Sequence, residues 1–154
     1  MSIDRATFDL VESIYTDRKQ DVYQLQKMGS YLLMTSGIIF TILIALEKLT
    51  SNGLEPYFFI YAIFILMASI LASALILIPP NLKADKHIDS LLTDDEIKDN
   101  FENIVNRVIA LHRSSIKELR SSIRIRKYTL LGSAIALAFA IYLGAGSFLV
   151  ALLP

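Results

Sequence analysis

Five basic side chains recur on one face of a helix that the sequence predicts for the second half of the chain. This basic row follows steps of four and three residues and consists of Arg113, Lys117, Arg120, Arg124 and Lys127. At 100° per residue, these steps keep the row within about 80° of the helix circumference. Like charges at this spacing repel one another unless an anion neutralises them. The row, with Arg107 nearby, therefore predicts a binding surface for the phosphates of a nucleotide or oligonucleotide.

Anionic lipid headgroups or an acidic protein partner could neutralise the same charges. Basic residues commonly precede a membrane span on its cytoplasmic side, and this tendency alone accounts for Arg120, Arg124 and Lys127. Arg113 lies eleven residues, or about 16 Å, before Arg124, too far for a headgroup contact if the helix stands upright in the membrane. The sequence leaves both interpretations of the row open.

The rest of the chain offers little catalytic chemistry. It contains no cysteine, which rules out disulfides and cysteine-ligated metals, and its two histidines do not form an HExxH pair. The acidic residues between 94 and 102 sit at a predicted helix start, where capping and the helix dipole explain them. His112 lies beside an apolar stripe, and we predict that it is a packed polar residue rather than a base. We expect no enzyme activity, no metal site and no cofactor.

Three long stretches without any charged residue cover residues 28–46, 56–82 and 128–154. The chain is 54% hydrophobic and 19% charged, with a mean hydropathy of +0.51, which is too apolar for an ordinary soluble domain. About 20 apolar residues suffice to cross the hydrocarbon core of a bilayer. The sequence therefore predicts an all-α membrane protein with three transmembrane helices. Because these stretches lack acidic and basic residues, a proton relay or ion-coupled transporter is disfavoured.

The charge pattern divides the chain into four segments. We expect a cytoplasmic amphipathic helix at 1–27, a transmembrane hairpin of two spans at 28–82, a cytoplasmic helical segment at 83–127 and a third transmembrane helix at 128–154. Basic residues near the span ends, Arg126 among them, place the N-terminus and the segment 83–127 in the cytoplasm. The C-terminus then lies outside.

Prolines and capping residues indicate where the helices begin and end. Pro56 suits the first turn of the second span, and Pro79-Pro80 ends it. Residues 93–96 form a capping box, which opens a helix expected to continue unbroken into the third span for more than about 50 residues. The amphipathic helix at 1–27 is expected to join the first span in the same way, with Gly29-Ser30 and Ser36-Gly37 as candidate kinks.

Small and hydroxyl residues recur within the predicted spans. A ladder with four-residue steps in the third span consists of Gly132, Ala136, Ala140 and Gly144. Such spacing allows helices to approach closely, either within one chain or around the axis of an oligomer. If oligomerisation forms a pore, hydroxyl groups are candidates to line it: Thr35, Ser36, Thr41, Ser133 and Ser147.

The layout resembles a family of small bacterial membrane proteins. An amphipathic helix precedes two close spans, YLLMTSGIIFTILIAL and PYFFIYAIFILMASILASALILIPP, and a capped basic helix runs into a third. This arrangement is similar to the membrane effectors of nucleotidyltransferase-linked anti-phage systems, namely the PycTM and SLATT types and the HalA channel of Hailong defence. The resemblance covers most of the chain in architecture, without a diagnostic motif.

The resemblance implies a homo-oligomer, often a tetramer, that forms a channel or disrupts the membrane as a defence effector. A nucleotide or oligonucleotide signal from a partner nucleotidyltransferase would control it by binding the cytoplasmic bundle. An alternative from another class is a membrane-anchored scaffold, whose cytoplasmic helices recruit a protein partner without forming a pore.

Overall fold

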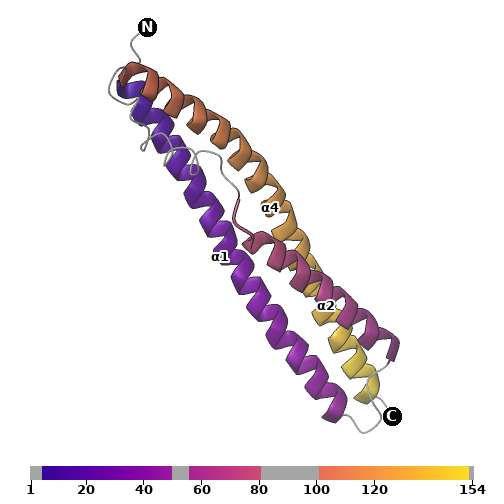
Figure 1. Cartoon of the computed structure of the whole chain (residues 1–154). Helices are drawn as coiled ribbons and strands as arrows, with labels where there is room; N and C mark the ends of the chain where they lie inside the picture. Colours follow the sequence, from indigo (N-terminus) through magenta and orange to yellow (C-terminus); the bar gives the residue numbers. More distant parts are fainter. Residues whose placement is uncertain (1–4, 50–55, 81–100, 153–154) are drawn as a thin grey trace. The chain divides into compact units, whose positions relative to one another are not determined.

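The computed structural model describes residues 5–49, 56–80 and 101–152, and these residues form three helices with no strand among them. Helix α1 comprises Arg5–Leu49, helix α2 comprises Pro56–Leu77, and helix α4 comprises Phe101–Leu152 (Figure 1). The capping box at 93–96 lies outside the described residues. Within them, the expected long helix is confirmed, because α4 continues for 52 residues from the basic row into the third apolar stretch.

All three helices are long and apolar enough to cross a membrane. At 1.5 Å per residue, α1 with its 45 residues and α4 with its 52 measure about 70 and 80 Å. The hydrocarbon core of a bilayer is only about 30 Å thick. Both long helices therefore have more length than a membrane crossing uses, whereas the 22 residues of α2 match a single crossing.

Proline chemistry explains both ends of α2. Pro56 is its first residue, where the missing N–H has no helical partner in any case. The helix ends at Leu77, just before Pro79 and Pro80, as the sequence predicts. In α1, the helix is continuous through Gly29-Ser30 and Ser36-Gly37.

The buried positions of each helix follow alternating steps of three and four residues. In α1 the buried residues are Val11, Tyr15, Val22, Leu25, Gly29, Ser36 and Leu43. In α2 they are Ala62, Leu66, Ser69, Ser73 and Ile76. In α4 the same steps connect Ile109, His112, Ser115, Leu119, Ile123, Arg126, Ser133, Leu137, Ala140, Gly144 and Ser147. This is the spacing that packs helices side by side in coiled coils.

The chain divides into two compact units, each of which takes residues from both long helices. The polar unit comprises Met1–Gln24 and Pro79–Ile125, and the apolar unit comprises Leu25–Ile78 and Arg126–Pro154. These two units are defined by which residues pack together. The segments predicted from the charge pattern have different boundaries, after residues 27, 82 and 127. Among the described residues, the core of the polar unit contains Val11, Tyr15, Val22, Ile109, His112, Leu119 and Ile123.

In the apolar unit, α2 runs antiparallel to the two long helices. Gly29 lies against Ile76 and Ser36 lies against Ser69, so that the pairing runs forward along α1 and backward along α2. Arg126 and Ser133 of α4 contact α2 in the same descending order. The apolar core at the other end of this unit consists of Leu43, Ala62, Leu66, Leu137 and Ala140.

Gly29 is required by packing, whereas Gly37 is not. A Cβ built on Gly29 would lie 2.9 Å from Cγ2 of Ile76, but one built on Gly37 meets nothing within 4 Å. The isoleucine side chain has little freedom to move, because its branched Cβ fixes χ1 in a helix. We expect Gly29→Ala to lower the free energy of unfolding by about 1–3 kcal/mol. The matched variant Gly37→Ala should raise it by up to about 1 kcal/mol, because alanine favours the helix.

Equilibrium unfolding in mixed detergent micelles measures both glycine variants on one scale. A shift of the same sign and size in the two variants would show that the close approach of Gly29 to Ile76 contributes nothing.

Candidate functional site

The basic row lies exposed on α4. Four of its members belong to the polar unit, namely Arg113, Lys117, Arg120 and Arg124, and the fifth, Lys127, follows three residues later on the same helix. The side chains of all five are exposed, and the helix is continuous across them. The regular helix therefore displays the row on one face, with about 21 Å along the axis between its first and last members.

No carboxylate of the described residues forms an ion pair with the basic row. One ion pair of the polar unit joins Arg18 and Asp21 of α1, at 3.2 Å between Nη1 and Oδ2. The five cations of the row therefore keep their mutual repulsion uncompensated within the residues that the structure describes. A surface of this kind attracts multivalent anions from solution or from a membrane.

Arg107 is exposed like the row but does not share its face. Six residues separate Arg107 from Arg113, which turns the two side chains about 120° apart around α4. The structure therefore brings together four of the five candidate ligand-binding residues and leaves Arg107 aside.

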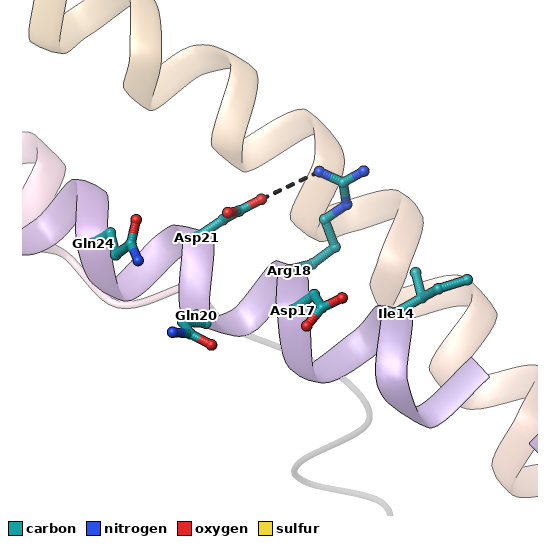
Figure 2. Close-up of a pocket in the computed structure, with 6 residues that line it drawn as sticks. All are labelled: Ile14, Asp17, Arg18, Gln20, Asp21 and Gln24. Atoms are coloured by element: carbon teal, nitrogen blue, oxygen red, sulfur yellow. Dashed lines mark hydrogen bonds and ion pairs between the residues drawn. The ribbon is translucent and has the colours of Figure 1, made fainter. Parts of the chain in front are cut away.

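A hollow on α1 in the polar unit carries charges of both signs. Figure 2 shows its described lining residues, which are Ile14, Asp17, Arg18, Gln20, Asp21 and Gln24. Arg18 and Asp21 neutralise each other there, and Asp17 adds a negative charge. An anionic ligand would meet a carboxylate at this hollow, so the basic row of α4 is the better anion site.

His112 lies in the core of the polar unit, as its place beside the apolar stripe predicted. It is only 8% exposed, and its ring stacks on Tyr15 with 4.7 Å between the ring centroids. Its Nδ1 is buried and finds no hydrogen-bond partner among the described residues. The imidazole is thus packed against Tyr15 of α1 in the core of the polar unit.

The small-residue ladder of α4 turns from the surface into the core. Gly132 is exposed and Ala136 half-buried, while Ala140 and Gly144 are buried. Steps of four residues advance the ladder by about 40° per step around the helix, and this drift explains the change of face. Ala140 and Gly144 therefore serve packing within the chain, where Leu43 occupies the space beside Gly144. A Cβ built on Gly132 would meet no atom of the described residues within 4 Å.

Four serines form a buried hydroxyl cluster where the helices of the apolar unit meet. The cluster consists of Ser36 of α1, Ser69 and Ser73 of α2, and Ser133 of α4, all at most 1% exposed. Oγ of Ser133 lies 2.7 Å from that of Ser73 and 3.0 Å from that of Ser69. Oγ of Ser36 lies 3.4 Å from that of Ser69. The sequence showed these serines as separate residues, and only the three-helix contact reveals them as one group.

The hydroxyl cluster can satisfy its own donors. Oγ of Ser133 donates to the carbonyl oxygen of Ser69, and Oγ of Ser69 donates to the carbonyl oxygen of Ser133, each at 3.0 Å. The remaining two hydroxyls then donate to the oxygens of these serines, so that every proton has an acceptor. Ser36, Ser133 and the buried Ser147 therefore face the interior of the chain rather than an outer surface.

Two other hydroxyls considered as pore-lining groups are exposed on α1. Oγ1 of Thr35 donates to the carbonyl oxygen of Tyr31 at 2.8 Å, and that of Thr41 donates to the carbonyl oxygen of Gly37 at 3.0 Å. These bonds are made within the same helix, one turn back. Thr35 and Thr41 are therefore the hydroxyl residues of this set that an oligomer or a pore could meet.

Arg126 is a residue whose role the sequence analysis missed. The charge pattern predicts Arg126 at a membrane surface, but the side chain is 8% exposed and binds the carbonyl oxygens of Ile76 in α2 and of Ile78 just after it. A signal was present, because Arg126 shares the three-and-four spacing of Leu119, Ile123 and Ser133. A charged residue in the phase of an apolar stripe faces the core.

Comparisons of the chain with protein-family models, with curated proteins and with solved structures gave no match.

Proposed function

We propose that the chain is a homo-oligomeric channel or pore-forming effector in the bacterial inner membrane, controlled by a phosphate-bearing ligand on the basic row. The observation that carries this proposal is the exposed row itself, whose charges find no ion-pair partner among the described residues. An anionic nucleotide or oligonucleotide signal from a partner nucleotidyltransferase, as in anti-phage defence, is the ligand that fits such a row.

The continuity of α4 supports a coupling between ligand and pore. The same helix carries the basic row and the apolar stretch from residue 128 onward, with no break between them. Ligand binding on the row would change the tilt or rotation of this helix. For this to happen, the ligand must bind one position of the helix more tightly than the other. The proposed orientation places the row in the cytoplasm, where such a signal is made.

Reversing two charges of the row should abolish ligand control. We expect Lys117→Glu with Arg120→Glu to weaken binding of a short oligonucleotide or nucleoside triphosphate by more than about 100-fold, because each charge-assisted contact contributes about 1.5–3 kcal/mol. Isothermal titration with the purified protein measures this loss. The matched control is Lys27→Glu with Lys48→Glu, which changes the net charge equally on exposed positions of α1.

Two further measurements distinguish phosphate groups of lipids from those of a soluble ligand. Vesicles with and without anionic lipid, each tested against the soluble ligands, show whether headgroups or a soluble anion occupy the row. Conductance of protein-containing liposomes, together with the oligomer mass in detergent, tests the channel. An oligomer that binds a cytoplasmic protein and conducts nothing would favour the membrane-anchored scaffold instead, and unchanged ligand binding in the charge-reversal variant would remove the row from the mechanism.

A further inference from the structure

The C-terminal end of α2 lacks donors for its own carbonyl groups. In a helix, the carbonyl oxygen of residue i accepts a hydrogen bond from the N–H of residue i+4. Residues 79 and 80 are prolines, which have no N–H, so the carbonyls of Leu75 and Ile76 cannot be paired in this way. A backbone carbonyl that is shielded from water and left unpaired costs about 1–3 kcal/mol.

Side chains from the two long helices supply donors at this end. From α4, Arg126 donates through Nη1 to the carbonyl oxygen of Ile76 and through Nη2 to that of Ile78. From α1, Nε2 of Gln26 donates to the carbonyl oxygen of Leu77 at 3.2 Å. Three successive carbonyls at the end of α2 are therefore bound by side chains of its neighbours.

The packing around this end brings both donors close. Gly29 follows Gln26 by three residues and lets α1 approach Ile76 to a distance that a side chain would prevent. Arg126 occupies a core position of α4, where the neighbouring core residues are Ile123 and Ser133. A planar guanidinium with several donors in fixed directions can serve two carbonyls at once, which a lysine cannot do in the same geometry.

We propose that Arg126, assisted by Gln26, is a helix cap supplied in trans. It pairs the carbonyl of Ile76, which Pro80 leaves without a donor, and the carbonyls of Leu77 and Ile78, where the two prolines keep the helix from continuing. The cap ties the end of α2 to α4, so that α4 cannot turn or slide at this level without either taking α2 with it or leaving carbonyls unpaired. Arg126 is thus a positioning residue of the apolar unit and is not available to a ligand or to lipid headgroups.

A double-mutant cycle tests the cap, because it asks whether the arginine matters only while the prolines are present. In the wild-type background, Arg126→Met, which keeps an apolar side chain of similar length, should raise the unfolding equilibrium constant by about 100-fold or more. In the background Pro79→Ala with Pro80→Ala, residues 79 and 80 regain N–H groups and can extend the helix. There the same arginine substitution should cost less than about 10-fold.

Equilibrium unfolding in mixed micelles provides the readout for all four proteins. If Arg126→Met does not fold, the same cycle with Gln26→Leu, expected to cost about 5-fold beside the prolines and less without them, decides the question. An equal cost in both backgrounds would mean that the side chain only fills space, and this result would overturn the proposal. So would the absence of any cost beside the prolines. Neither result depends on ligand binding to the basic row.

Discussion

Replacing Ser69 with leucine is expected to separate the three helices of the apolar unit and to lower the free energy of unfolding by about 2–5 kcal/mol. Ser69 is fully buried, and its hydroxyl contacts both Ser36 and Ser133. The larger side chain overfills the contact, at a cost of about 1–3 kcal/mol. It also removes interhelical hydrogen bonds, which contribute about 0.6 and at most about 1.7 kcal/mol each within a membrane.

Two control variants distinguish these contributions. Ser69→Ala removes the hydroxyl without adding volume, and it should cost only about 1–2 kcal/mol. Ala68→Leu adds a similar volume on the neighbouring, exposed position of α2, and it should leave stability nearly unchanged. Reversible unfolding in mixed micelles gives the three values. If Ser69→Leu is as stable as Ala68→Leu, the hydroxyl cluster does not lie at a close contact of three helices.

Truncation of Leu119 is expected to have a comparable effect on the polar unit. Its side chain is fully buried in α4, and the described core of this unit has few other large aliphatic residues. Leu119→Ala removes buried methyl groups and leaves a cavity, which typically costs about 2–5 kcal/mol. Amide hydrogen exchange should therefore become about 30-fold faster, or more, along the polar-unit parts of α1 and α4.

The neighbouring Ile125 provides the control, because its side chain is 63% exposed. Ile125→Ala removes a similar number of carbon atoms from a mostly exposed side chain, and exchange in the polar unit should stay within about 2-fold of the wild type. Equal exchange rates in the two variants would contradict the burial of Leu119 between packed helices.

The three helices could be predicted from the sequence, because their extent depends on local information. Uncharged length indicates the apolar segments, and prolines mark both ends of α2. The residues that α1 buries in the polar unit, Val11, Tyr15 and Val22, recur at the multiples of three- and four-residue steps that an amphipathic helix requires. The exposure of the basic row follows from the same periodicity, since its members lie on a different face of α4 from the apolar residues.

Partners across helices could not be predicted, because periodicity gives a direction but not a neighbour. The four-step ladder looked like one packing face, yet its drift around α4 leaves Gly132 exposed while Gly144 is buried. The hydroxyl cluster depends on how α1, α2 and α4 are aligned along their axes. Arg126 was interpreted by its charge, whereas its role depends on two prolines that precede it by more than forty residues.

The hydroxyls of Thr35 and Thr41 have a consequence for ions. Each proton points back to a carbonyl of α1, so that the side chain offers its surroundings a methyl group and the lone pairs of an oxygen. Such a group can help to solvate a cation but has no hydrogen to give to an anion. Wherever water reaches either threonine, α1 therefore offers a lone pair but no proton, an environment that suits sodium or potassium better than chloride although it carries no formal charge.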